Sequence, residues 1–275
     1  MCNGRFKMKT GLVLSGGGAR GFAQIGILKV LRKNGIYIDA ISGCSVGALI
    51  GACYAYDQNP ENIEKLMLKI QSSKDVYDYS FSIKGLIKGY KLQQYITEYF
   101  KEGKDVKFKD LKIPLSINAT DIVLGEEIIF SKGQLVPAIM ASLSYPGFFT
   151  TRKVDNRICV DGGVINPLPL DHLEGMDYLI LVDVSEENKN IDEESNLKDV
   201  IIQSTLIMQK KLVENKIKEC KTKYAIIKPD LKNIPILDFK QSPKLITIGE
   251  KEAEKHIERI KRDIEKIQKE LHNIK

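Results

Sequence analysis

The stretch GLVLSGGGARG at residues 11–21 joins a short apolar run to a turn rich in glycine. The apolar residues 11–14 predict a buried strand, and the apolar pattern after the turn predicts a helix that stops at Asn34-Gly35. Consecutive glycines leave backbone N–H groups exposed, so such a turn is suited to bind an anion. The stretch therefore predicts a strand, an anion-binding turn and a helix in direct succession.

The same order repeats immediately along the chain. Residues 36–41 predict a second strand, which runs into Gly43-Cys44-Ser45-Val46-Gly47 and then into a helix with small residues at 48–55. Strands that alternate with helices form parallel sheets covered on both faces. We therefore expect the α/β class, as a three-layer α/β/α sandwich around a central, mostly parallel sheet.

Later segments continue this alternation of strands and helices. Apolar runs predict strands over 114–121, 126–130, 157–160, 178–184 and 224–227, and helices over 63–70, 92–100, 135–142 and 197–220. Residues 75–90 are rich in Tyr, Ser and Gly, a composition compatible with a mobile flap, and the sequence does not decide whether they move as a lid.

Composition limits the classes of function. The chain has 275 residues, of which 43% are hydrophobic and 28% charged, as in an ordinary globular protein. Its net charge of 42 − 36 = +6 is compatible with an anionic lipid surface, but no nucleic-acid-binding module is present. The five cysteines are odd in number and contain no C-x-x-C pair, which argues against a disulfide framework and against a zinc site. We expect reduced thiols, a cytoplasmic location and no metal.

The two ends of the chain are expected to lie outside the main domain. Residues 1–7 are polar and predict an extension rather than a signal peptide, and no apolar run reaches the length of about 18 residues that a membrane span requires. We expect the catalytic domain over 8–248 and an amphipathic helix over 249–275. The apolar residues of that helix recur at alternating steps of four and three, at 253, 257, 260, 264, 267, 271 and 274. Packing along the domain is the favoured interpretation, with a dimerising coiled coil or an interfacial helix as the alternatives.

The pentapeptide at residues 43–47 fits G-x-S-x-G. A serine on a tight turn between strand and helix has a strained backbone, and Gly43 and Gly47 relieve the crowding around Ser45. The turn also places backbone N–H groups and the positive helix end near a developing negative charge. Ser45 is therefore the candidate nucleophile, although the pattern alone also suits a plain turn that begins a helix.

The glycine turn allows two interpretations. Gly16, Gly17 and Gly18 can supply N–H donors to an oxyanion, with Arg20 and Gly21 as supporting residues. The same residues fit the G-x-G-x-x-G pattern of a dinucleotide site, and Asp39 lies 39 − 16 = 23 residues beyond Gly16, close to the spacing of its acidic residue. Asp39 falls inside the second predicted strand rather than at its end, which favours the oxyanion interpretation.

The base that would activate Ser45 has two candidates. His172 is the only histidine outside the charged C-terminal helix, and its sequence context favours a surface position. Asp161 ends a predicted strand and precedes Gly162-Gly163, so its carboxylate is expected at the end of a strand. A carboxylate serves as a base if burial raises its pKa and the serine hydroxyl is within hydrogen-bond reach. Asp161 is the preferred candidate.

Three motifs stand in one order: GGGARG at 16–21, GCSVG at 43–47 and DGG at 161–163. Together with ASLSYPGFF at 141–149, NATD at 118–121 and NPLP at 166–169, they resemble the patatin-like phospholipase family. The resemblance covers about residues 10–185. It implies a Ser-Asp dyad of Ser45 and Asp161, an oxyanion hole at Gly16–Gly18, and calcium-independent hydrolysis of acyl esters of phospholipids, lysophospholipids or neutral lipids without a cofactor.

We therefore expect a serine acyl hydrolase whose partner is a lipid or acyl-ester substrate, with peripheral contact at the inner membrane surface as a further expectation. A homodimer through the C-terminal helix is the alternative to a packed helix. Two rival functions are a dinucleotide-binding protein that uses the glycine turn and a catalytically idle scaffold of the same fold.

Overall fold

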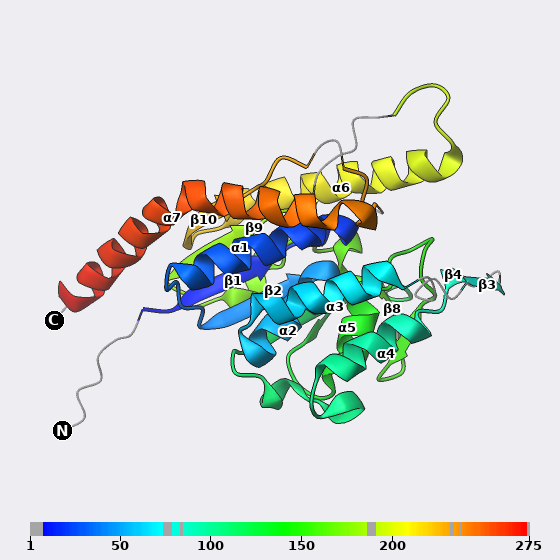
Figure 1. The fold of residues 1–275 in the computed structure, drawn as a ribbon, viewed down its shortest axis with the longest axis horizontal. Coiled ribbons are helices and arrows are strands. Elements are labelled where there is room, and N and C mark those ends of the chain that lie inside the picture. Colours follow the sequence, from blue (N-terminus) through cyan, green and yellow to red (C-terminus); the bar gives the residue numbers. More distant parts are fainter. Residues whose placement is uncertain are drawn as a thin grey trace.

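The computed structural model describes residues 8–73, 79–82, 85–185, 191–231, 234–236 and 238–273. Its core is an eight-stranded sheet in the order β10-β9-β1-β2-β5-β8-β7, with β6 paired to β5 (Figure 1). The parallel part comprises β1 (Thr10–Leu14), β2 (Ala40–Cys44), β5 (Leu115–Asp121), β9 (Tyr178–Val182) and β10 (Lys223–Ile227). The carboxyl ends of these strands therefore meet at one edge of the sheet.

Three further strands run antiparallel beside β5. They are β6 (Glu126–Phe130), β7 (Arg152–Val154) and β8 (Arg157–Asp161). β6 pairs with residues 117–121 of β5, whereas β2 pairs with 115–118 and β8 with 119–121. Because β6 overlaps both of the others along β5, β2 and β8 must share the opposite edge of β5 in succession. The end of β2 therefore meets the end of β8 head to head.

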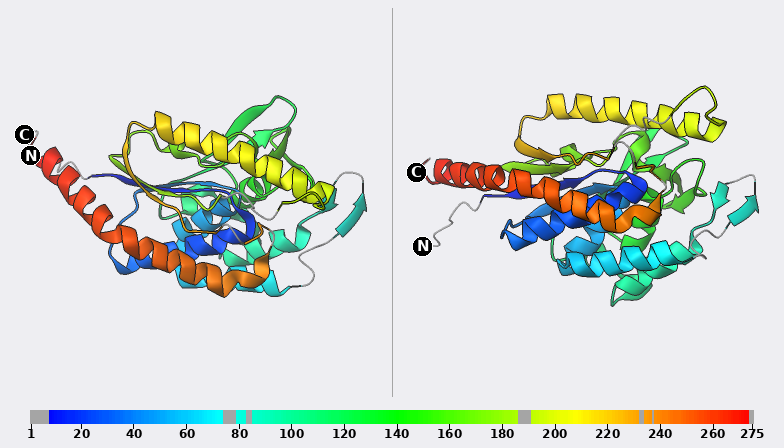
Figure 2. Two further views of the ribbon diagram at one scale, coloured as in Figure 1. Left: turned by 90° about the horizontal axis from the view of Figure 1, so that it is seen from above. Right: turned by 45° about the horizontal axis from the view of Figure 1, so that its top comes forward.

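Helices cover both faces of the sheet. On one face, α1 (Phe22–Lys33), α2 (Val46–Asp57), α5 (Leu135–Ser142) and α7 (Ser242–Asn273) form the main core with Leu12 and Leu14 of β1, and α3 (Pro60–Ser72) and α4 (Tyr90–Tyr99) pack outside them. On the other face, Val13 and Leu181 lie in a second core with Val213 of α6 (Leu197–Glu219). Figure 2 shows α6 alone on its side of the sheet. The predicted three-layer α/β/α sandwich is confirmed.

Two predicted boundaries are wrong. β2 begins at Ala40 rather than at residue 36, because its pairing with β1 starts where Gly11 faces Ala40. α7 begins at Ser242, seven residues before the expected start at 249, because Pro243 occupies the first turn of the helix, where the missing N–H of proline has no acceptor to lose. Among the described residues, no helix is both long and apolar enough to cross a membrane.

The segment at 75–90 lies partly outside the described residues. Within it, the structure describes β3 (Tyr79–Ser82) and β4 (Gly85–Ile87), which form a two-stranded antiparallel sheet. Ile87 continues into the body of the protein, where its N–H donates to the carbonyl of Phe148 at 2.9 Å.

α7 packs along α1 and continues beyond it (Figure 1). The seam residues Ala253, Ile257, Ile260 and Ile267 are buried, and Ile264 and Leu271 are half-buried against the same core. The two helices approach most closely at glycines. A methyl group on Gly249 would overlap the carbonyl oxygen of Ala23, and one on Gly26 would overlap that of Ile246. Glycine is therefore required at this crossing for close approach of the two backbones.

This crossing predicts that Gly249→Ala destabilises the protein. In an exposed helix the change stabilises by up to about 1 kcal/mol, but here overpacking should lower the free energy of unfolding by about 1–3 kcal/mol. Chemical denaturation measures the difference. Lys251→Ala, an exposed change in the same helix, is the control and should stay within about 0.5 kcal/mol. A Gly249→Ala protein as stable as the wild type would contradict the close packing of α1 and α7.

Candidate active site

Ser45 occupies the turn between β2 and α2. Its φ of 54° and ψ of −124° are a strained combination for a residue with a side chain. The turn is tight enough that a Cβ atom on Gly43 would lie 2.6 Å from the carbonyl oxygen of Gly47, and one on Gly47 would lie 2.6 Å from that of Ser15. Glycines at both positions therefore allow the sharp turn that raises the Ser45 hydroxyl above the end of the sheet, as the G-x-S-x-G pattern predicts.

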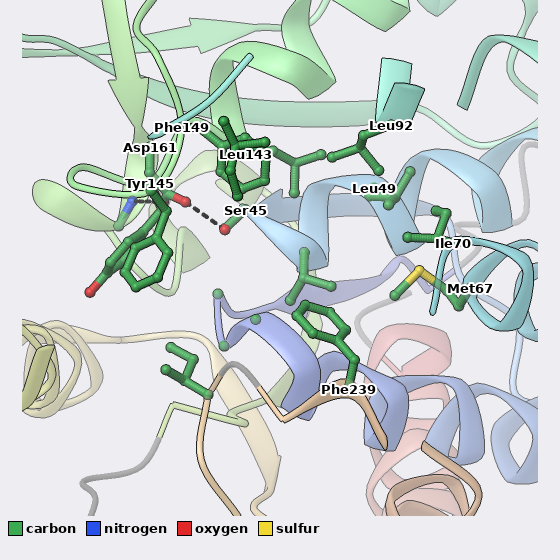
Figure 3. A pocket seen from close by; sticks show the side chains of 18 of the residues that line it. Ser45, Leu49, Met67, Ile70, Leu92, Leu143, Tyr145, Phe149, Asp161 and Phe239 are labelled. Carbon is green, nitrogen blue, oxygen red and sulfur yellow. Dashed lines mark hydrogen bonds between the residues drawn. The ribbon is translucent and has the colours of Figure 1, made fainter. Parts of the chain in front are cut away.

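Asp161 is the last residue of β8, and the shared edge of β5 brings it to Ser45. Asp161 faces Ala119, the residue of β5 directly after the last one that pairs with β2. The Ser45 hydroxyl donates a hydrogen bond of 2.5 Å to Oδ2 of Asp161 (Figure 3). Residues 116 positions apart in the sequence are thus in direct contact, as the preferred interpretation of the sequence predicted.

The other oxygen of Asp161 is held by its neighbours. Oδ1 accepts the Gly163 N–H at 2.7 Å, and the thiol of Cys44 lies 3.7 Å from the same oxygen. Desolvation by burial raises the pKa of Asp161 to about 6, against the opposing effect of the hydrogen bonds from Ser45, Gly163 and Cys44. The carboxylate is therefore ionised at neutral pH, yet it is basic enough to take a proton.

The glycine turn lies beside Ser45 and offers unpaired donors. A Cβ atom on Gly16 would be 3.4 Å from the Ser45 Cβ, but the Gly16 N–H itself donates to the carbonyl of Pro167 at 3.0 Å. Within the described chain, the N–H groups of Gly17 and Gly18 have no acceptor. Gly18 has a φ of 54°, a left-handed conformation that glycine adopts readily. Of the three predicted oxyanion residues, Gly17 and Gly18 thus have free N–H groups, whereas Gly16 shapes the turn.

Two further backbone N–H groups, those of Val46 and of Ser45 itself, lie at the turn. The N–H of Val46 has no acceptor among the described residues. Val46 is the first residue of α2, so this N–H lies at the positive end of the helix dipole. The N–H of Ser45 itself donates to the hydroxyl of Ser142 at 2.8 Å. Ser142 is fully buried at the end of α5 and holds the elbow in place. The sequence contained Ser142 in the block at 141–149 but gave no sign of this contact.

The supporting residues of the turn are buried. The side chain of Arg20 is fully buried, and its Nε donates to the carbonyl of Ile234 at 2.8 Å, so Arg20 braces the turn against the loop before α7. A Cβ atom on Gly21 would lie 2.5 Å from Cγ2 of Val46, so the first helix packs directly against the elbow.

His172 lies in a different network. Its side chain is 1% exposed, contrary to the expected surface position, and Nε2 lies 3.1 Å from Oε1 of Glu127. Asn118 donates to the same Glu127 oxygen at 2.9 Å and to the carbonyl of Asn166 at 2.8 Å. Gly162 packs against the Asn118 side chain. His172 is therefore linked through Glu127 to Asn118, which packs under the Asp161-Gly162 turn. The hydrogen-bond partner of the Ser45 hydroxyl is Asp161 and not His172.

Asp39 does not lie near the glycine turn. It precedes β2, and its Oδ2 accepts the N–H of Thr10, the first residue of β1, at 2.9 Å. The glycine turn follows the last residue of β1, at the opposite edge of the sheet. A ribose-binding acid belongs at the carboxyl edge, so the geometry argues against the dinucleotide interpretation.

A pocket of about 130 Å³ extends from Ser45 and Asp161. In Figure 3 the polar pair lies at one end and apolar side chains line the remainder. They come from segments far apart in the sequence and include Leu49, Met67, Ile70, Leu92, Leu143, Phe149 and Phe239. A cavity of this shape accepts an apolar chain whose polar end reaches Ser45.

A strained serine hydrogen-bonded to a buried carboxylate, beside free backbone N–H donors, is an arrangement that can activate the serine hydroxyl as a nucleophile. The chain belongs to the patatin-like phospholipase family, whose family model matches residues 12–173. This confirms the resemblance that the sequence motifs indicated.

Several curated proteins are similar to this chain. An uncharacterized NTE family protein of Mycobacterium tuberculosis is 32% identical over 178 residues, which cover 64% of this chain and 49% of that protein. The neuropathy target esterase sws of Drosophila melanogaster is 32% identical over 187 residues, covering 65% of this chain and 13% of that protein. The lysophospholipase NTE1 of Scheffersomyces stipitis is 32% identical over 181 residues, covering 63% and 12%. The chain spans about half the length of the mycobacterial relative and a much smaller share of the other two.

Solved structures share the fold. VipD from Legionella pneumophila aligns with a TM-score of 0.55 at 15% identity, over 92% of this chain and 67% of that chain. ExoU, in its complex with SpcU from Pseudomonas aeruginosa, aligns with a TM-score of 0.51 at 16% identity, over 92% of this chain and 51% of that chain.

The raised pKa of Asp161 predicts the pH dependence of activity. We expect kcat/KM for an uncharged acyl ester to rise with pH through about 6 and then level off, because only the ionised carboxylate accepts the Ser45 proton. Initial rates between pH 4.5 and 8.5 measure the profile. Histidine also titrates in this range, so His172→Gln is the matched control and should keep the inflection. Loss of the inflection in that variant would assign it to His172 and contradict the role of Asp161.

Proposed function

We propose that the chain is a serine acyl hydrolase that cleaves acyl esters of phospholipids, lysophospholipids or related lipids through Ser45 and Asp161. The observation that carries the proposal is the hydrogen bond of 2.5 Å from the Ser45 hydroxyl to Asp161 at the end of an apolar pocket. The relatives named as an esterase and a lysophospholipase support the substrate class.

The first half of the reaction forms an acyl-enzyme. Asp161 accepts the hydroxyl proton as Oγ of Ser45 attacks the ester carbonyl carbon. The carbonyl oxygen becomes an oxyanion, to which the N–H groups of Gly17, Gly18 and Val46 are the available donors. When the tetrahedral intermediate collapses, the C–O bond to the leaving alcohol breaks and Asp161 gives its proton to that alcohol. The acyl group stays on Ser45.

The second half returns the enzyme to its starting state. Asp161 removes a proton from water as the water oxygen attacks the acyl carbon. The same N–H donors stabilise the second oxyanion, and Asp161 then protonates Oγ as the fatty acid leaves. Loss of one oxyanion donor typically raises the barrier by about 2.7–4 kcal/mol, so these donors are central to the rate. Neither half uses a metal ion, and we propose that activity is independent of calcium.

The remaining expectations about organisation are also proposals. We propose that residues 8–248 form the catalytic domain. The predicted extension at residues 1–7 falls outside the described residues. The helix from 249 onward belongs to the same packed unit, because α7 contributes Ala253, Ile257 and Ile260 to the main core.

A covalent label tests the mechanism. A fluorophosphonate probe followed by peptide mass spectrometry should modify Ser45, because the probe reacts with serines whose hydroxyl is activated by a base. Ser45→Ala should abolish both the label and hydrolysis of a short-chain acyl ester, and Asp161→Asn should reduce both by at least about a hundredfold, within the range of a lost general base. Cys53→Ala, a change in α2 away from the pocket, should leave both unchanged.

A wild-type protein that is neither labelled nor active on any acyl ester or lysophospholipid would support the idle-scaffold alternative. Full activity of Ser45→Ala would exclude the mechanism.

The pocket predicts selectivity for acyl-chain length. Met67→Phe narrows the far end of the pocket, so kcat/KM for esters of about twelve to sixteen carbons should fall about tenfold relative to a four-carbon ester. Activity on a series of p-nitrophenyl esters measures the ratio. Met140 is equally buried but does not line the pocket, so Met140→Phe is the matched control and should leave the ratio unchanged. An unchanged ratio in Met67→Phe would place the acyl chain elsewhere.

A further inference from the structure

Exposed apolar side chains are concentrated on one part of the surface. Thirteen large apolar side chains of the described residues are exposed, and all except Tyr37 and Tyr90 lie on α6, in the β5–β6 turn, on β6 or β8 beside β5, or directly after Gly163. Single exposed apolar residues are normal, whereas a concentrated set marks an interaction site. We call these eleven residues the apolar rim.

α6 is apolar on both of its faces. Its inner face packs on the sheet through Leu206 and Val213. Its outer face carries five exposed residues at helical spacing, Leu197, Val200, Ile201, Ile207 and Met208. A surface helix ordinarily has a polar outer face. Figure 2 shows α6 on the side of the sheet opposite α1 and α7, and no described residue covers these five side chains.

The turn between β5 and β6 has an apolar tip. Ile122, Val123 and Leu124 are 50%, 68% and 61% exposed. Oδ1 of Asp121 accepts the N–H groups of Val123 at 3.0 Å and of Leu124 at 3.2 Å, which fixes the shape of the turn. Because Asp161 faces Ala119, this tip lies beyond the level of the catalytic carboxylate. The fold therefore presents three consecutive apolar side chains past the edge of the sheet that bears the site.

The tip and α6 belong to the same side of the sheet. Side chains alternate across a strand, and residues that pair directly across two strands share a face. Ile129 pairs with Asn118, and the Ile122 N–H donates to the carbonyl of Ile158 at 3.0 Å. Ala119 and Cys159 lie in a core with Ala141 of α5, so Asn118, Ile129 and Ile158 face the opposite side, where α6 lies. Ile129 and Ile158 are both exposed there.

Two residues of the apolar rim directly adjoin pocket residues in the chain. Gln209 of α6 lines the pocket and donates to the carbonyl of Gly163 at 3.0 Å, while the adjacent Met208 is exposed. Gly163 also lines the pocket, and the adjacent Val164 is exposed. Gln209 and Gly163 of the pocket wall therefore each have a residue of the rim as their direct neighbour in the chain.

Basic side chains accompany the rim. Lys153 pairs with Ile158 across β7 and β8 and thus lies on the same face. Lys211, three residues beyond Met208, is exposed on the outer side of α6 beside Glu214. Glu127, the acidic residue of β6 on this face, is turned to His172 and Asn118. Acidic side chains, among them Asp199 in the first turn of α6 and Glu214 paired with Lys211, also border the rim. Apolar side chains bordered by charges of both signs suit the boundary between acyl chains and headgroups.

We propose that the apolar rim docks on the surface of a lipid bilayer or micelle and that α6 and the 122–125 turn insert into it beside the mouth of the pocket. The proposal rests on the proposed function, because an acyl chain that leaves the lipid at this surface enters the pocket without crossing water. A second copy of the chain is the competing occupant of this surface. Vesicle binding and light scattering together distinguish a lipid surface from a second copy.

The test compares binding to vesicles with hydrolysis of a monomeric ester. The probe is a phosphatidylcholine vesicle, alone or with about 30% phosphatidylglycerol, and the readout is co-flotation. The double variant Val123→Asp/Ile201→Asp places two charges in the rim at exposed positions outside the pocket. We expect vesicle binding and hydrolysis of vesicle lipid to fall at least about tenfold, since charges resist burial in the apolar layer. Hydrolysis of a soluble four-carbon ester should stay within about twofold of the wild type.

Tyr37→Asp is the matched control. Tyr37 is 82% exposed and precedes β2, at the opposite edge of the sheet, so this variant should bind vesicles as the wild type does. Ser45→Ala should also bind fully, which separates docking from catalysis. If the wild type binds vesicles through the rim but hydrolyses no ester, the proposed function fails and the docking surface stands.

Three results would overturn the docking surface. They are a wild type that binds neither vesicle, a double variant that binds as well as the wild type, and a dimer in light scattering that the double variant dissociates without any effect on vesicles. The last result would assign the rim to contact between two copies of the chain.

Discussion

The contact between Ser45 and Asp161 depends on the way one edge of β5 is divided between two strands. β2 pairs with the first part of that edge and β8 arrives from the opposite direction along the second part. β2 can end there because the chain turns sharply at Ser45 into α2, and β8 can end there because Gly162 follows and packs on Asn118. The pocket, the free N–H donors and the proposed reaction all depend on this head-to-head junction.

The junction has a cost in stability that the surrounding structure offsets. Ser45 adopts a strained backbone conformation, and conformations of this kind cost on the order of 1–3 kcal/mol. Asp161 is a buried carboxylate without a cationic partner among its described contacts, and three neighbouring donors stabilise it instead. Ser142 holds the Ser45 N–H, and the main core packs the helices α1, α2 and α5 around the elbow. Strain and a destabilised charge at a functional site are a common exchange of stability for activity.

The sequence predicted most of the elements and the central pair of residues, for physical reasons that are local. Glycines at 43 and 47 are needed wherever a serine must turn this sharply, and β1 and β9 consist of apolar residues typical of strands buried on both faces. Features that depend on distant contacts were not predicted. The start of β2 is set by its register with β1. His172 is buried in contact with Glu127, and the Gly16 N–H donates to the carbonyl of Pro167. The contact of Ser142 with Ser45 spans 97 residues and has no local pattern.

Asp161 is held as a buried carboxylate against Ser45, and the dependence of the free energy of unfolding on pH measures this directly. The pKa of Asp161 is raised from 3.8 to about 6 in the folded protein, so above pH 6 the ionised group destabilises the fold, and below about pH 4 it is neutral in both states. Asp161→Asn carries no charge at any pH. We expect this variant to be more stable than the wild type at pH 8 by about 2–3 kcal/mol, and the difference to disappear as the pH falls to about 4. A variant that is no more stable than the wild type at pH 8, or a difference that does not change with pH, would contradict it.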